Sequence, residues 1–240
     1  MIEKSCAECG GTGWVLRNED GERFARECVC QKEEARLRRF LAAQVPERYR
    51  DCSFADFHET RLALTKAKGI AQEFAAAYPV VDAGLLFLGP AGRGKTHLAI
   101  AILNEITRAK GKNALYVNFA DLLMKIQSTF KTDAVESKED VITPYAEVEL
   151  LVLDELGATK PSDFARDMLY ALLNTRYNRK KITIATSNFM DELGPGDREK
   201  LEDRIGYRLR SRLHEMCQTV LVTGEDFRKE VKRADFHARY

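Results

Sequence analysis

The stretch GLLFLGPAGRGKTHLAIAI, residues 84–102, decides the fold of this chain. It begins with an apolar run, passes through a glycine-rich loop and continues as an apolar helical pattern. The loop GPAGRGKT, residues 89–96, fits the pattern G-x-x-x-x-G-K-[ST] and lies between a buried strand and a helix, as that pattern requires. The sequence therefore predicts a phosphate-binding loop, with a chance glycine turn before a helix as the alternative.

Each residue type in this loop has a chemical reason. Glycines let backbone N–H groups close around phosphates, and the N-terminus of the following helix favours negative charge. Lys95 would reach the β- and γ-phosphate oxygens, and the hydroxyl of Thr96 would hold Mg²⁺. We expect these consecutive residues to contact the nucleotide: Gly89, Pro90, Ala91, Gly92, Arg93, Gly94, Lys95, Thr96 and His97.

Polar residues follow two further apolar strands. LLVLDE, residues 150–155, ends in the acid pair Asp154 and Glu155, and ITIATSN, residues 182–188, ends in Asn188. The carboxyl ends of parallel strands are where open α/β sheets bind ligands. Asp154 would bind Mg²⁺, Glu155 would orient and polarise the attacking water, and Asn188 would hydrogen-bond that water or the γ-phosphate. The alternative is that these residues only close strands into turns.

Apolar strands alternate with helical patterns over most of the chain. The spacing predicts strands at residues 85–89, 114–119, 149–155, 182–187 and 219–224. It predicts helices at residues 95–109, 121–130, 162–177 and 198–215, and a loop at 132–143. Buried strands joined by helices indicate an α/β fold, with a parallel sheet flanked by helices on both faces.

A basic stripe marks the last of these predicted helices. In RIGYRLRSR, residues 204–212, Arg204, Arg208 and Arg212 recur every four residues and would share one helical face. A solvated basic face is one interpretation. The other is an arginine finger that crosses a subunit boundary and stabilises the γ-phosphate charge of a neighbouring protomer.

Four of the six cysteines lie in the first thirty residues. Cys6-x-x-Cys9 and Cys28-x-Cys30 supply four thiolates, which is the ligand set of a tetrahedral structural zinc site. The second pair is spaced CxC, unlike the commoner CxxC, and a redox pair or unbound thiols are the alternatives. A module this small has little core of its own, so bound metal would supply its folding energy.

The patterning divides the chain into three segments. We expect a zinc-binding module at residues 1–30, an amphipathic linker helix at 31–45 that Pro46 ends, and a nucleotide-binding domain at 46–240. Cys52 and Cys217 are expected to be small buried hydrophobes. The four histidines show no metal-ligand spacing with one another.

Length and composition exclude several classes of protein. With 240 residues, 45% hydrophobic and 31% charged, the chain has the composition of an ordinary globular protein of one medium domain and a small appendage. A net charge of +1 gives no overall field for nucleic acid, so any DNA contact must come from a local patch. No apolar run approaches the roughly 18 residues that span a bilayer, and the first residues lack the apolar core of a secretory signal. We therefore expect a cytoplasmic protein without a membrane segment.

Several segments together resemble a known family. GLLFLGPAGRGKTHLAIAI, LLVLDELG, IATSN, RLRSRL and TGEDFR, in this order and spacing, resemble the AAA+ helicase-loader family of DnaC and DnaI, which is related to the transposition helper IstB. The resemblance covers about residues 46–228. It implies an AAA+ P-loop core that binds ATP with Mg²⁺, with Walker A at 89–96, Walker B at Asp154 and Glu155, and sensor 1 at Asn188. Three aromatic residues lie near the place where relatives bind adenine: Tyr49, Phe54 and Phe57.

The resemblance also bears on the C-terminal part and on DNA. RLRSRL is similar to box VII of the initiator DnaA, which implies Arg212 as the trans-acting finger and Arg208 as the second candidate. Only 16 residues follow Gly224, which resembles the shortened C-terminal lid of loaders and leaves Arg228 as either a nucleotide contact or a surface charge. Relatives carry a helical insertion that touches single-stranded DNA, and residues 122–145 could hold it. Three lysines there are available for phosphates: Lys125, Lys131 and Lys138.

The cysteine module has a resemblance of its own. CAECGGTGW, residues 6–14, is similar to half of the CxxCxGxG zinc repeat of DnaJ chaperones. In loaders of the DnaI type a zinc-binding N-terminal region engages the replicative helicase, so the resemblance implies this partner for residues 1–30 by position. The helix at 31–45 would be a linker or part of the same contact surface.

The resulting hypothesis is an ATP-dependent loader of the replicative helicase, an ATPase whose protomers assemble in the ATP-bound state around single-stranded DNA or the helicase. One alternative is an IstB-like transposition helper that remodels DNA for a transposase, although the zinc module counts against it. The other is an adaptor that uses ATP only as a switch and binds its partner through the zinc module.

Overall fold

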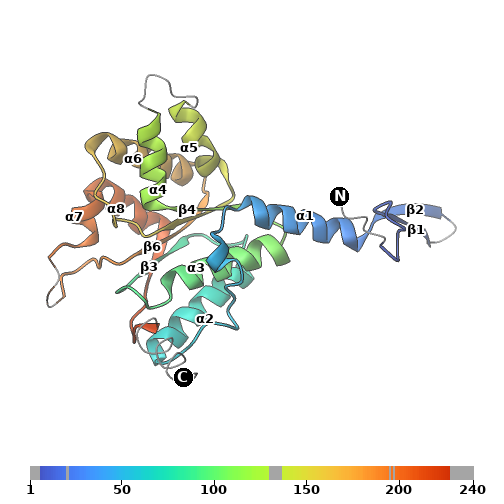
Figure 1. The fold of residues 1–240 in the computed structure, drawn as a ribbon, viewed down its shortest axis with the longest axis horizontal. Helices are drawn as coiled ribbons and strands as arrows, with labels where there is room; N and C mark the ends of the chain where they lie inside the picture. The colour runs from blue at the N-terminus through green and yellow to red at the C-terminus, as the bar shows by residue number, and fades with distance from the viewer. Residues whose placement is uncertain (1–5, 20–21, 130–136, 195, 197, 228–240) are drawn as a thin grey trace, which may run out of the picture.

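A five-stranded parallel sheet forms the centre of the molecule (Figure 1). The computed structural model describes residues 6–19, 22–129, 137–194, 196 and 198–227. The strands lie in the order β4-β5-β6-β3-β7, with these bounds: β3 Gly84–Leu88, β4 Ala114–Asn118, β5 Leu150–Asp154, β6 Ile182–Ser187 and β7 Cys217–Leu221. The α/β fold and the parallel sheet expected from the sequence are confirmed.

Helices cover both faces of the sheet because successive strand residues point to opposite sides. Leu85 and Phe87 belong to one core, together with α2 (Leu62–Ala77), α3 (Lys95–Asn104) and the π-helical turn η2 (Glu105–Ala109). Leu86 and Leu88 belong to the other core. That second core contains α4 (Phe119–Ser128), α5 (Lys138–Glu147), α6 (Asp163–Asn178), α7 (Leu201–Ile205) and α8 (Tyr207–Met216). All strand residues of β3 and β5 are buried, as the apolar runs in the sequence indicate.

Three sequence predictions of local structure need correction. The helix expected at 198–215 is two helices, because Gly206 adopts φ +88° between α7 and α8. The loop expected at 132–143 is wrong for its second half, where α5 begins: Ser137 caps this helix and forms a reciprocal capping box with Asp140. The first part of that loop lies outside the described residues. The linker helix α1 (Val29–Ala42) ends before Val45.

The N-terminal segment extends away from the sheet. The hairpin of β1 (Trp14–Glu19) and β2 (Glu22–Glu27) leads directly into α1, and Figure 1 shows this hairpin at the end of α1 that is remote from the sheet. Phe40 is the buried residue of α1, and the guanidinium of Arg108 in η2 lies 3.7 Å from the centre of its ring. Most other side chains of α1 and of the hairpin are exposed.

Membrane insertion finds no support in the helices. Among the residues that the structure describes, none of the helices combines the length and the apolar character needed to cross a bilayer.

Candidate functional site: a nucleotide cavity and a cysteine cluster

The phosphate-binding loop joins β3 to α3 in a conformation that requires glycine. Gly94 has φ +88° and caps the N-terminus of α3, and a Cβ atom there would lie 2.5 Å from the ring of Phe57. Gly92 has φ +78°, and its Cβ would lie 2.1 Å from the carboxylate of Asp226. Phe57 and Asp226 therefore pack against the loop from two sides. N–H groups at the start of a helix such as α3 are suited to bind an anion.

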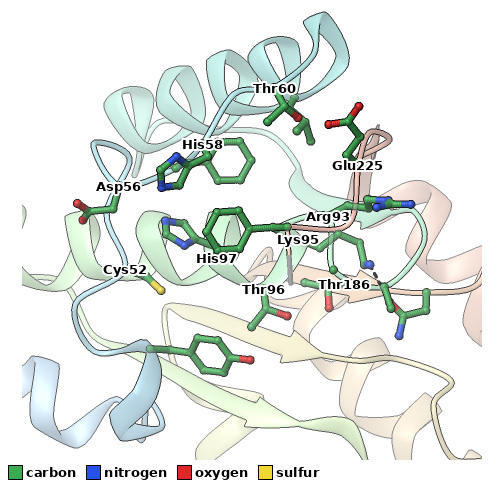
Figure 2. A pocket seen from close by; sticks show the side chains of 18 of the residues that line it. Cys52, Asp56, His58, Thr60, Arg93, Lys95, Thr96, His97, Thr186 and Glu225 are labelled. Atoms are coloured by element: carbon green, nitrogen blue, oxygen red, sulfur yellow. Dashed lines mark hydrogen bonds between the residues drawn. The ribbon is translucent and has the colours of Figure 1, made fainter. Parts of the chain in front are cut away.

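Lys95 and Asn188 meet at the centre of this site. The Lys95 ammonium is buried and donates to the carbonyl of Pro90 and to Oδ1 of Asn188, each at 2.7 Å (Figure 2). Asn188 reaches this position because β6 lies between β5 and β3 in the sheet. The structure therefore brings together Lys95, which is expected to bind the phosphates, and Asn188, which is expected to bind the γ-phosphate or the attacking water.

Asp154 is the buried carboxylate of the site, with 2% of its surface exposed. It accepts three hydrogen bonds: from Thr96 at 2.9 Å, from Tyr116 at 2.9 Å and from Thr186 at 2.6 Å. Burial raises the pKa of Asp154, while these hydroxyls act in the opposite direction. Burial, together with the nearby carboxylate of Asp154, also raises the pKa of Tyr116. A hydroxyl and a carboxylate in contact are the hard oxygen donors that Mg²⁺ prefers, so Thr96 and Asp154 fit that ion.

Glu155 is presented by an unusual backbone. Its φ of +56° is left-handed, and its N–H donates to Thr186 Oγ1 at 3.0 Å. Its carboxylate accepts from the side-chain amide of Asn118 at 3.1 Å, and Asn118 also caps α4. The carboxylate is exposed and lines the cavity, where a water molecule could be activated. The sequence analysis did not identify Asn118 and Thr186. Both lie at the carboxyl ends of strands, which is the same signal that identified Asp154.

A cavity of about 300 Å³ continues from the phosphate loop (Figure 2). Its other wall comes from the segment before α2, including Tyr49 and Phe57, whereas Phe54 lies outside it. His97 donates a hydrogen bond from Nε2 to the carbonyl of Ser53 at 2.7 Å, which holds this wall against α3. Cys52, expected to be buried, lines the cavity half-exposed, and its burial raises its pKa to about 11.

The three arginines do not share one helical face. Arg204 lies on α7, donates to the carbonyls of Gly157 and Ala158, and has a structural role. Arg212 lies on α8, pairs with Glu215 at 2.9 Å and covers the ring of Tyr177.

Arg208 is exposed on α8, and neither Arg208 nor Arg212 lines the nucleotide cavity of its own chain. The sequence analysis also missed Arg210, which is buried and forms a bidentate pair with Asp191. Arg228 and Lys131 lie outside the described residues. Lys125 donates to the hydroxyl of Tyr145 at 2.7 Å and so joins α4 to α5.

The four N-terminal cysteines form one cluster. Cys6, Cys9, Cys28 and Cys30 have sulfur atoms that all lie within 4.8 Å of one another. The N–H of Gly13 donates to the sulfur of Cys9 at 3.3 Å, a bond that stabilises a thiolate. Because Cys28 is the N-cap of α1, the cluster joins the hairpin to this helix. The set of four thiolates fits a structural zinc ion.

Comparison with known proteins shows the family of the chain. The chain is similar to the replicative helicase loader DnaC of Escherichia coli strain K12, with 30% identity over 173 residues that cover 70% of this chain and 68% of the relative. It is equally similar to the loader DnaC of Buchnera aphidicola subsp. Baizongia pistaciae, with 30% identity covering 71% of this chain and 70% of that one. A crystal structure of the DnaC helicase loader superposes with a TM-score of 0.65 and 26% identity, over 74% of this chain and all of the other. The model of the IstB-like ATP binding protein family matches residues 16–235, so the chain belongs to this family of ATP-binding proteins, which includes relatives that load the replicative helicase.

Proposed function

We propose that this chain is an ATP-hydrolysing loader of the replicative DNA helicase. One observation carries the proposal: at one cavity Lys95 donates to Asn188 and Thr96 donates to Asp154, in a chain whose relatives are named helicase loaders. The identity to DnaC extends over about 70% of both chains.

The chemistry at this cavity is phosphoryl transfer from ATP to water. When bound by Thr96 and Asp154, Mg²⁺ would neutralise charge on the β- and γ-phosphates. Lys95 and the N–H groups of residues 89–96 bind the phosphates. Glu155, held by the Asn118 amide, orients the attacking water and takes part of its positive charge, and Asn188 fixes the γ-phosphate or this water.

The site of one protomer needs a cation from the next. Arg212 and Arg208 lie on α8, away from their own cavity, as a residue acting on a neighbour must. In a head-to-tail assembly formed with ATP, we assign Arg212 the role of trans-acting finger, with Arg208 second. Hydrolysis would then be coupled to assembly.

The N-terminal module is proposed to bind zinc and to dock the helicase. We divide the chain into this module at residues 1–30, a linker segment at 31–45 that contains most of α1, and the ATPase domain at 46–240. In the β1–β2 pairing, Trp14 and Leu16 share a face with Ala25. Trp14 is 54% exposed and Leu16 is 73% exposed, so this face presents apolar area to a partner. Single-stranded DNA is the second proposed partner, bound by the assembled ATPase domains.

Complex formation tests the function. We would mix the zinc-loaded 27.2 kDa protein with the replicative helicase of its own organism, with and without a non-hydrolysable ATP analogue, and measure complex mass by light scattering. A stoichiometric complex is expected. The double variant Trp14→Ala, Leu16→Ala should lose it, whereas Val80→Ala, which removes an even more exposed apolar side chain from another surface, should keep it.

Two other functions predict different results. A transposition helper, which the family name suggests, would form no complex with the helicase and would bind a transposase instead. An adaptor switched by ATP would bind its partner without multiple turnovers of ATP. The similarity to DnaC and the complete set of hydrolytic side chains favour the loader.

A further inference from the structure

The side chain of Arg93 is the unexplained feature of the nucleotide cavity. This residue stands in the phosphate loop between Gly92 and Gly94 and lines the cavity. Its Nε and Nη1 atoms are buried and have no hydrogen-bond partner among the residues that the structure describes. Buried donors of a charged group normally have acceptors, because leaving them unpaired costs much of their hydration energy. These two donors of the loop therefore lack an acceptor in the part of the chain that the structure describes.

The surrounding backbone fixes where this side chain begins. The carbonyl of Gly92 accepts from the N–H of Phe227 at 3.1 Å, and Phe57 packs against Gly94. The ring of Phe227 in turn stacks on His58, with 5.0 Å between the centroids. Arg93 consequently projects from a loop that is held at both neighbouring residues, and Figure 2 shows its side chain in the same part of the cavity as Lys95.

The acidic groups of the cavity are engaged elsewhere. Three acidic residues line it: Glu225 accepts from Arg61 at 2.7 Å, Glu155 accepts from Asn118, and Asp56 accepts from the hydroxyl of Ser53. Since none of the described residues accepts from Nε or Nη1 of Arg93, we look for their acceptor on a ligand. Phosphate oxygens suit a guanidinium best, because its planar N–H groups can bind two oxygens at once.

We propose that the Arg93 side chain binds the polyphosphate chain of the nucleotide as a second cation beside Lys95. This inference rests on the proposed function, since it takes the cavity to be the ATP site. It goes beyond the phosphate-loop pattern, which needs only backbone N–H groups at this position. Arg93 would stabilise the nucleotide-bound protein through hydrogen bonds to phosphate oxygens. In the nucleotide-free protein the same donors are unpaired among the described residues.

The test variant is Arg93→Met, which keeps the apolar stem and removes the donors. Affinity for ATP with Mg²⁺, measured by calorimetry, should fall about 10- to 100-fold, the usual range for a hydrogen bond to a charged group. Without nucleotide the variant should melt about 2–6 °C higher than the wild type, because its unpaired donors are gone. Arg93→Lys should recover part of the lost affinity. Arg179→Met, on an exposed arginine that pairs with Glu147, is the matched control and should leave affinity unchanged.

Comparing nucleotides locates the contact. A loss for ATP alone places the guanidinium on the γ-phosphate, and an equal loss for ATP and ADP places it on the phosphates they share; both support the inference. Adenosine should bind the variant and the wild type equally.

Two results would overturn the proposal. One is unchanged ATP affinity with a lowered melting temperature, which would make Arg93 structural. The other is an equal loss for adenosine, which would mean a change in cavity shape. A wild-type protein that binds no ATP would instead refute the proposed function itself.

Discussion

Thr186 links the two acidic residues of the site, and its removal gives the sharpest prediction. Its hydroxyl donates to Asp154 at 2.6 Å and accepts the N–H of Glu155 at 3.0 Å. Thr186→Val keeps the shape of the side chain and removes both bonds. Losing a hydrogen bond to a charged group costs about 1.5–3 kcal/mol, and the unpaired N–H adds about 1 kcal/mol or more. We therefore expect about 3 kcal/mol of lost stability, or about 6–12 °C in melting temperature.

The functional effect of Thr186→Val should be larger than its structural effect. The left-handed backbone of Glu155 loses the bond that holds it, so this carboxylate should leave the attacking position. We expect kcat for ATP hydrolysis to fall about 10- to 100-fold at saturating Mg²⁺ and ATP, with ATP still bound. With one hydroxyl fewer, the pKa of Asp154 should rise further, which moves the acidic limb of the rate profile to higher pH.

A matched variant separates stability from catalysis. Thr183 lies on the same strand and accepts from the buried Arg176 at 2.9 Å, on the side of the sheet away from the nucleotide. Thr183→Val should destabilise the protein and leave turnover per folded molecule unchanged. Equal turnover by wild type and Thr186→Val, or an equal fall in both variants, would refute the reasoning.

Three further predictions concern the acid pair, the arginine and the cysteines. Glu155→Gln should bind ATP without turnover, and Arg212→Ala should be inactive alone. Their mixture should regain ATPase activity, because at some interfaces an intact Glu155 then meets an intact Arg212. A mixture as inactive as its parts would exclude the trans role. Because burial raises the pKa of Asp154, the native state keeps its proton to higher pH than the unfolded chain, so stability is lost as pH rises through the native pKa. Without nucleotide, the melting temperature of Asp154→Asn should thus increasingly exceed that of the wild type as pH rises above about 4, until the native pKa is passed. The variant should also lose stabilisation by Mg²⁺ and ATP. A gain that did not grow with pH in this range would contradict the assignment. A mercurial reagent should release one zinc per chain. Cys28→Ser should lose the metal but keep ATP affinity, since the cluster lies at the end of α1 that is remote from the sheet (Figure 1). A metal-free wild-type protein would rule out the site.

The sequence was sufficient wherever chemistry depends on neighbours along the chain. The loop at residues 89–96 could be predicted because its glycines, lysine and threonine are consecutive and lie between a strand and a helix. Asp154, Glu155 and Asn188 could be predicted because parallel strands present their carboxyl ends at one edge of a sheet. The grouping of the four N-terminal cysteines could be predicted from their number and spacing alone.

Other features depended on contacts between residues far apart in sequence. The sequence does not show that Thr186 joins Asp154 to Glu155, or that Asn118 holds Glu155, because threonine and asparagine at strand ends are ordinary turn residues. The regular spacing of Arg204, Arg208 and Arg212 suggested one face, yet Gly206 divides the helix there.

The sequence by itself determined the α/β class, the phosphate-binding loop and the cysteine set, since each depends on local order and periodicity. Tertiary structure decided which hydroxyls hold Asp154, which arginines are structural and that Arg93 has no acceptor among the described residues. The physical reason is that hydrogen-bond partners and burial are set by how strands and helices pack, and packing joins residues whose separation along the chain carries no information about their distance in space.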